Sequence, residues 1–273
     1  MHTPPPFVPP VRRIGPLQPL TWLALAWRDM AHAGWISFAH GLALTLLGAA
    51  ILWVGRDRFW LMAGALSGFL VVAPVLATSF YALSRAIERR EPADSAVVWR
   101  TWTRWQGARG REYWCLVHFG LLLALAATGW VLTSAALIIA FAPQPVLKPM
   151  DFVLQVMLAR EGWLFEAWLA LGSLLAAPIF ASSVVAMPLL LDRRATVLQA
   201  VLTSWQAVAN NPLPMAIWAA LILGFTLLGL GSLLLGLIPI MPMLGHASWH
   251  AYRDLVDVSG LPAREPEGAE GAL

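Results

Sequence analysis

The run LPMAIWAALILGFTLLGLGSLLLGLIPIMPML, residues Leu213–Leu244, decides how this chain folds. It is 32 residues long and contains no charged side chain, whereas one helix needs about 20 apolar residues to cross a bilayer. The segment Gly229–Ser232 near its middle combines two glycines with a serine and can form a tight turn. The run is therefore either one long crossing or a hairpin of two, and the surrounding charges distinguish between them.

Four other apolar runs precede this one along the chain, at Trp35–Val54, Phe59–Ser84, Trp114–Phe141 and Trp163–Leu191. Hydrophobic residues make up 59% of the sequence and charged residues 12%, whereas soluble domains have about 25% charged residues. A soluble globule of this size could not hide so much apolar surface. The sequence therefore predicts an all-α, polytopic helical membrane bundle.

Arginines gather in alternate connections between these runs. They are frequent in residues 12–28, 85–111 and 193–194, and sparse in the other connections. Because arginine-rich connections stay in the cytoplasm, these segments are expected to lie inside. Arg253 after the last run fits this pattern if Leu213–Leu244 is a hairpin, whereas a single crossing would leave it outside. Six transmembrane helices are therefore expected, the last two at residues 213–229 and 232–250, with both termini cytoplasmic.

A weak threefold repeat is visible, because an amphipathic segment precedes each pair of spans. Apolar residues spaced by three and four predict short helices lying in the membrane interface. Their apolar faces are Leu20, Leu23, Trp27, Met30 and Gly34; then Val98, Trp102 and Trp105; then Leu198, Val201, Trp205 and Val208. The expected organisation is three hairpins in one membrane domain, residues 20–258, between a proline-rich disordered tail, 1–19, and a second disordered tail, 259–273.

Three stretches resemble a known family: Pro239–Leu255 (PIMPMLGHASWHAYRDL), Met187–Arg193 (MPLLLDR) and Ser84–Pro92. They are similar to the bacterial integral membrane family catalogued as domain of unknown function 2189. The similarity is expected over roughly Val11–Val258. It implies an integral membrane protein, chiefly of proteobacteria, and it brings no established activity and no catalytic residues.

Histidines form the main candidate site. In the six-span arrangement His40, His118, His246 and His250 fall in one layer on the cytoplasmic side. Imidazole is a good ligand for haem iron, copper or zinc, so this layer is a candidate metal site. The alternative is that these histidines bridge water and lipid or hydrogen-bond between helices. Glu166, a carboxylate three residues inside the fourth span, is a second candidate, although it lies close enough to the surface to reach lipid headgroups.

Functional expectations remain broad. The sequence contains no GxSxG, Walker, HExxH or GxGxxG motif, so no catalytic residue and no cofactor is predicted. A non-enzymatic protein of the bacterial inner membrane is expected: a scaffold, an assembly factor or a small permease. The alternative is a haem- or metal-binding redox subunit that uses the histidine layer. The expected partners are anionic lipids, reached through the arginine-rich connections, and other membrane proteins; nucleic acid is not expected.

Overall fold

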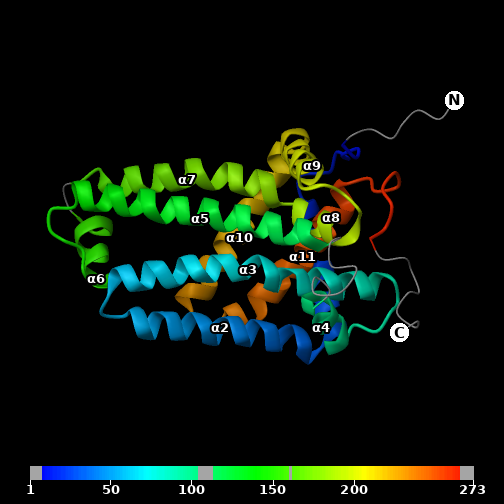
Figure 1. Ribbon diagram of the computed structural model, residues 1–273, viewed down its shortest axis with the longest axis horizontal. Helices are drawn as coiled ribbons and strands as arrows, with labels where there is room; N and C mark the ends of the chain where they lie inside the picture. Colours follow the sequence, from blue (N-terminus) through cyan, green and yellow to red (C-terminus); the bar gives the residue numbers. More distant parts are fainter. Residues whose placement is uncertain (1–7, 104–112, 160–161, 265–273) are drawn as a thin grey trace. The chain divides into compact units, whose positions relative to one another are not determined.

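The structure, a computed structural model, describes residues 8–103, 113–159 and 162–264, and only the backbone of residues 66–75. The described residues form helices and two isolated β-bridges but no strand, so the predicted all-α class is confirmed (Figure 1). A π-helical turn, η3 (Val153–Met157), follows α6. The α-helices are α1 (Gln18–Ala33), α2 (Trp35–Gly55), α3 (Phe59–Glu88), α4 (Ser95–Thr103), α5 (Trp114–Phe141), α6 (Pro149–Phe152), α7 (Leu164–Ser183), α8 (Ala186–Asp192), α9 (Val197–Asn210), α10 (Pro212–Gly231) and α11 (Leu237–Leu255).

Four helical segments of the described residues are long and apolar enough to cross a membrane: Trp35–Gly55, Trp114–Phe141, Leu164–Asp192 and Pro212–Gly231. The third is interrupted between α7 and α8. At this break the Val185 N–H donates to the Ser204 hydroxyl at 3.4 Å. The hydroxyl takes the place of a backbone carbonyl of the helix.

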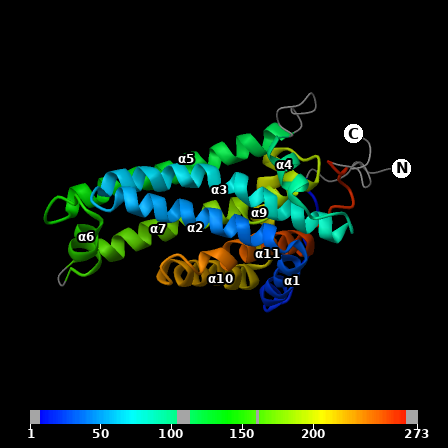
Figure 2. The ribbon, with the colours of Figure 1, turned by 90° about the horizontal axis from the view of Figure 1, so that it is seen from below.

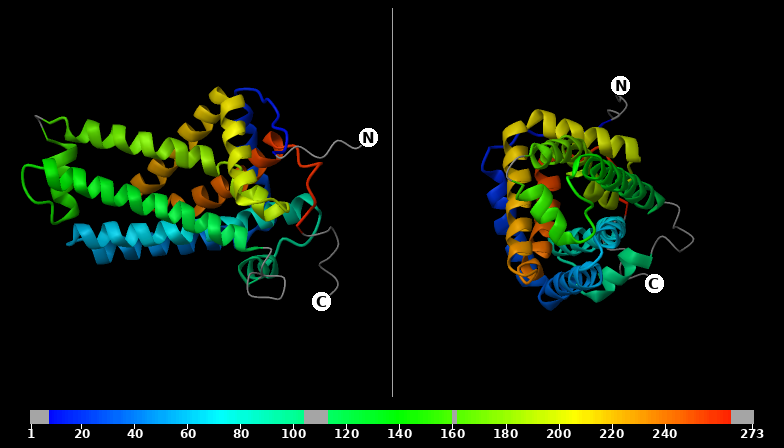
Figure 3. Two further views of the ribbon diagram at one scale, coloured as in Figure 1. Left: turned by 45° about the horizontal axis from the view of Figure 1, so that its top comes forward. Right: turned by 90° about the vertical axis from the view of Figure 1, so that its left-hand side faces the viewer.

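The run Leu213–Leu244 folds back on itself, with α10 and α11 side by side (Figure 3). The turn occupies residues 232–236, slightly later than the glycine-containing segment suggested. Leu233 and Leu234 take up the left-handed backbone conformation there, with φ of 57° and 69°. The hydroxyl of Ser232 donates to the Gly229 carbonyl and accepts from the Gly236 N–H, both at 2.8 Å. Gly229 itself lies against Leu237, where the two helices approach closely.

The chain divides into two compact units, and α2, α3, α5 and α7 contribute residues to both. Unit 2 comprises residues 46–73 and 120–180. Its packing is aromatic: Trp168 lies 5.4 Å from Trp130 and 5.3 Å from Phe152 between ring centroids. The Trp168 indole N–H also donates to the Ser134 hydroxyl at 2.6 Å. Ring contacts and this hydrogen bond therefore both fix the Trp168 side chain.

Unit 1 comprises residues 1–45, 74–119 and 181–273, of which the structure describes the ranges given above. Its centre is α11, and α1 lies against this helix (Figure 2). The Trp22 indole and the Gln18 amide both donate to one oxygen of Asp254, each at 2.7 Å. Trp22 also packs edge-on against Trp218 of α10. Gly34, with φ of 60°, lets the chain turn directly from α1 into α2.

A helix is present at each predicted interfacial segment, as α1, α4 and α9, although Trp105 lies outside the described residues. An interfacial helix turns its apolar face toward lipid, and part of the predicted apolar face is exposed in both α1 and α9. The apolar stripe of α9 includes exposed Leu198 and Trp205, whereas its buried residues are Ala200, Thr203, Ser204 and Ala207. In α1, Leu20 and Trp27 are likewise exposed. In α9 small residues therefore make the protein contacts, whereas the buried face of α1 also includes Trp22 and Met30. The exposed large residues of both helices are left for another apolar environment.

The segments expected to be disordered tails include residues with defined contacts. The Arg12 N–H donates to the Leu255 carbonyl at 2.8 Å, and the Asp257 N–H donates to the Pro10 carbonyl at 2.9 Å. Near the other end, the Arg264 guanidinium is buried and donates to the Leu190 carbonyl at 2.7 Å. Proline lacks a backbone N–H donor, but its carbonyl can still accept. A proline-rich segment can therefore still form backbone hydrogen bonds through its carbonyl groups. Residues 1–7 and 265–273 lie outside the described part.

Candidate functional site

A chain of hydrogen bonds runs through the buried centre of unit 1. His246 on α11 is fully buried, and both of its ring nitrogens are bonded: Nε2 lies 2.9 Å from the Ser37 hydroxyl and Nδ1 lies 2.7 Å from the Ser84 hydroxyl. Ser84 donates to Oδ2 of Asp29 at 2.7 Å. His250, one turn after His246, reaches the same oxygen through Nε2 at 2.8 Å. We call these five residues the histidine chain.

The direction of each bond in the histidine chain can be assigned from the one donor that is fixed. Because Ser84 gives its proton to Asp29, its oxygen is the acceptor for Nδ1–H of His246. Nε2 of His246 then accepts from the Ser37 hydroxyl. The chain therefore joins α2, α3, α11 and α1 through one continuous series of donors and acceptors.

His40 lies beside this chain without entering it. Its Nδ1 donates to the Ile36 carbonyl at 2.8 Å, and its ring packs edge-on against Phe80, with ring centroids 5.5 Å apart. Phe80 in turn packs against His246 at the same centroid distance. The buried Nε2 atom of His40 has no hydrogen-bond partner among the described residues.

The other predicted site residues lie elsewhere. His118 is exposed on α5, 5.8 Å from the Trp114 ring, beside a cavity of about 670 Å³ that Cys115 and Arg194 also line. Glu166 is exposed in the first turn of α7. Within the described ranges, no group of three or more His, Cys, Asp and Glu side chains is placed to hold a metal ion. The histidine layer is thus brought together in part, as His246 and His250 joined through Ser84 and Asp29.

Asp29 is the acid at the end of the histidine chain and is 1% exposed. Burial raises the pKa of its carboxyl group, but the hydrogen bonds from His250 and Ser84 and the two histidine charges lower it, leaving the pKa below the ordinary value of 3.8. Asp29 is therefore held as a carboxylate. Its second oxygen, Oδ1, is buried and has no hydrogen-bond partner among the described residues.

This lowered pKa predicts a loss of stability in acid. Above pH 3.8 the Asp29 carboxylate is charged in both the folded and unfolded states, so its stabilising contribution is complete. As the pH falls through the lower folded-state pKa, the carboxylate is protonated and that contribution is lost. We expect the unfolding temperature in detergent to fall less between pH 5 and pH 3 in Asp29→Asn than in the wild type. Parallel pH profiles for the two proteins would contradict this assignment.

A second polar feature of unit 1 is a cavity of about 470 Å³, the arginine cavity. Three carboxylates and the Trp249 side chain contribute to its wall. The carboxylates are Glu88, Glu91 and Asp192. Five arginines also line it: Arg85, Arg89, Arg90, Arg193 and Arg253.

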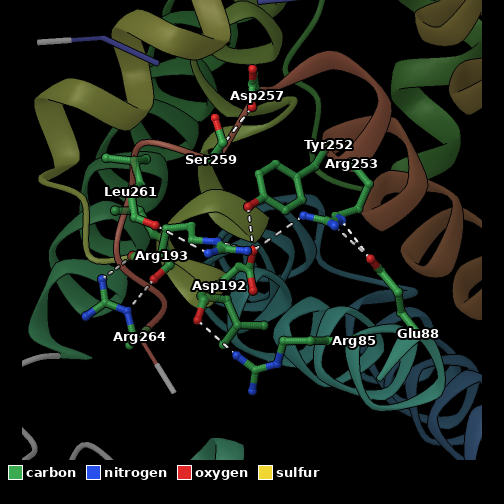
Figure 4. A network of polar contacts seen from close by, with 12 residues as sticks. Arg85, Glu88, Asp192, Arg193, Tyr252, Arg253, Asp257, Ser259, Leu261 and Arg264 are labelled. Atoms are coloured by element: carbon green, nitrogen blue, oxygen red, sulfur yellow. Dashed lines mark hydrogen bonds and ion pairs between the residues drawn. The ribbon is translucent and has the colours of Figure 1, made fainter. Parts of the chain in front are cut away.

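Asp192, the last residue of α8, is the buried centre of the network beside this cavity (Figure 4). Its Oδ2 accepts from the Tyr252 hydroxyl at 2.7 Å and from Arg193 at 2.9 Å, and its Oδ1 lies 3.6 Å from Arg89. Arg253 links this centre to Glu88, whose Oε1 it approaches to 2.8 Å. Ion pairs thereby link the ends of α3, α8 and α11.

Sequence reasoning missed the acids in both features. Asp29 lies in a helix composed mainly of apolar and small residues, and Asp192 directly follows the three leucines Leu189–Leu191. An acid next to a buried run needs a partner, and this signal could have singled out both residues. The sequence pattern assigns the arginines only to membrane orientation.

Comparisons with known proteins identify a family for part of the chain. Residues 61–192 match the model of the family described as Predicted integral membrane protein (DUF2189). The match covers 132 of the 273 residues, slightly under half, and confirms the resemblance seen in the sequence. It includes Ser84–Pro92 and all but the last residue of Met187–Arg193, and ends before Pro239–Leu255. A search of curated proteins and one of solved structures found no match.

Proposed function

We propose that this integral membrane protein is a non-enzymatic, multi-pass protein of a bacterial inner membrane, a small permease whose histidine chain takes up and releases a proton. The observation that supports this is the continuous hydrogen bonding from Ser37 through His246 and Ser84 to Asp29. Ionisable groups inside a membrane bundle are costly to bury and commonly form proton relays in transporters.

The proton movement is balanced along the chain. A proton arriving at Ser37 allows its hydroxyl to pass its own proton to Nε2 of His246. Nδ1 then gives its proton to Ser84, which passes its own proton to Asp29. Asp29 ends neutral, His246 has changed tautomer, and both serines remain hydroxyls. The His250 side chain is 14% exposed and its Nε2 is bonded to Asp29. When the single ring proton of His250 is on Nδ1, Nε2 accepts the proton from neutral Asp29 and Nδ1 releases its own.

Ser84 allows a sharp test, because it joins two titratable groups without titrating itself. In proteoliposomes containing a pH-sensitive dye, we expect a potassium diffusion potential to drive faster proton entry with the wild type than in protein-free vesicles. Ser84→Ala should return entry to the protein-free rate, and Ser84→Thr, which keeps the hydroxyl, should restore part of it.

The matched control is Ser79→Ala, on the same helix. Ser79 is fully buried, and its hydroxyl has no hydrogen-bond partner among the described residues. This variant should conduct like the wild type. A wild type no faster than empty vesicles, or equal losses in Ser79→Ala and Ser84→Ala, would refute the relay.

Six crossings, with both termini in the cytoplasm, are the topology we propose for this permease. Its support is the folding back of α11 on α10 and the placement of the arginines. An alkaline phosphatase fusion after Asp254 is expected to be inactive, because that enzyme needs the periplasm. A fusion within residues 56–58 should be active. Activity from the fusion after Asp254 would exclude six crossings.

The haem or metal alternative makes a different prediction. Both ring nitrogens of His246 and one of His250 are engaged in hydrogen bonds, so a metal would have to displace them. We expect the purified protein to show no Soret band and less than stoichiometric metal. A Soret band lost in His246→Ala but retained in His32→Ala would instead support a redox subunit.

A further inference from the structure

The arginine cavity carries an excess of positive charge. Its five arginines and three carboxylates leave a formal charge of +2. A phosphate group on a monoester carries about −1.5 to −2 at pH 7, so a single such group would neutralise the cavity. Guanidinium groups also match phosphate geometrically, since each can donate two parallel hydrogen bonds.

Two of the three carboxylates of the cavity, Glu88 and Asp192, already have partners in the protein. Glu88 accepts from Arg253 and, at 3.0 Å, from the Trp249 indole. Both oxygens of Asp192 have cationic or hydroxyl partners, as described above. Backbone carbonyls also accept from this wall, since Arg85 donates to Leu191 and Arg193 to Leu261. Each guanidinium has five N–H donors, so an anion with several oxygens can accept from more than one of these side chains.

Of the five arginines that line the cavity, Arg90 is the exposed one. It follows the end of α3 in the left-handed backbone conformation, with φ of 58°, where glycine is favoured. The Glu91 N–H donates to the Ala86 carbonyl at 2.9 Å, so the local backbone closes the helix end and does not depend on the side chain. The fold does not require a side chain at this position, and the Arg90 side chain is exposed at the cavity, where a ligand can reach it.

We propose that the arginine cavity is a binding site for a phosphate group, carried either by free phosphate or by the headgroup of an anionic phospholipid. Its volume falls in the usual range for small-ligand sites, roughly 300–1,000 Å³. The site does not depend on the proton relay, because it shares no side chain with the histidine chain.

The test uses the full chain purified in a neutral detergent, with inorganic phosphate as the probe and calorimetric titration as the readout. We expect saturable phosphate binding, weakened at least tenfold in Arg90→Gly, while the unfolding temperature of that variant stays equal to the wild type or rises. Arg28→Ala removes the same charge from an exposed position outside the cavity and should bind within twofold of the wild type.

A second arm separates the two sources of phosphate. The protein is placed in nanodiscs of phosphatidylcholine with or without phosphatidic acid, and bound lipid is counted by native mass spectrometry. Retained phosphatidic acid that is lost in Arg90→Gly identifies a headgroup site, and phosphate binding without lipid retention identifies a free-phosphate site. The proposal is overturned if neither ligand binds, or if Arg90→Gly and Arg28→Ala bind both as the wild type does. Proton entry should remain at the wild-type rate in Arg90→Gly, so that phosphate binding and the proton relay are tested independently.

Discussion

Asp192→Ala is expected to lower the unfolding free energy by about 3–5 kcal/mol, the usual effect of removing one partner from a buried ion pair. The side chain of Asp192 is 3% exposed and lies within 4.0 Å of Arg89, Arg193 and Arg253. Its loss leaves three neighbouring cations and the Tyr252 hydroxyl without their common acceptor. Denaturant unfolding in mixed micelles, followed by tryptophan fluorescence, measures the change.

The control for this result is an exposed pair. Arg56 and Asp57 approach to 3.3 Å, but their side chains are 58% and 68% exposed, and solvent screens such pairs. Asp57→Ala should therefore leave the unfolding curve almost unchanged. If Asp192→Ala and Asp57→Ala had similar small effects, Asp192 would not be the centre of a stabilising network.

Gly41→Ala is expected to cost at least about 1–3 kcal/mol, the usual range for overpacking. A methyl group on Gly41 would overlap the carbonyl oxygen of Ile238, at the point where α2 meets α11. That obstacle is backbone, so no side chain can rotate away and the two helices must separate. Ser37 and His246 lie on these same helices, so proton entry in proteoliposomes should fall together with stability.

Gly224→Ala is the matched substitution, because a methyl group added there would meet no neighbouring atom within 4 Å. Alanine is also the better helix former, by about 1 kcal/mol. We expect this variant to be as stable as the wild type or slightly more so. Equal losses at Gly41 and Gly224 would mean that any glycine replacement disturbs these helices, and that the close approach is unimportant.

The sequence predicted where the long helices begin and end better than which way they face. Charges and prolines bound the apolar runs, and those bounds agree with the helices to within a few residues, as in Trp35–Gly55. The apolar stripe of α9 predicts an interfacial helix, and the stripe includes the exposed side chains of Leu198 and Trp205. The stripe does not indicate which residues pack against the protein; these are small ones such as Ala200 and Ala207, which allow close packing in an apolar solvent.

The candidate site was predicted only in part, for a related reason. Histidine chemistry marked His246 and His250, and their spacing placed them one turn apart. Their partners Ser37, Ser84 and Asp29 come from three other helices. Which of many serines meets a histidine depends on helix rotation and depth, and neither property is encoded in a local pattern. The arginine cavity is assembled from three separate helix ends, so no local sequence pattern predicts it either.

The contacts between the two ends of the chain bear on how the protein is made. Trp22 and Gln18 of the first helix share Asp254, more than 230 residues later in the chain, and the Pro10–Arg12 segment pairs with Leu255–Asp257. When α2 through α10 have been inserted, α11, the helix with which α1 makes most of its contacts, has therefore not yet been synthesised. Until translation passes Asp254, Trp22 and Gln18 lack their acceptor, and unit 1 can close only after the last helix has been synthesised.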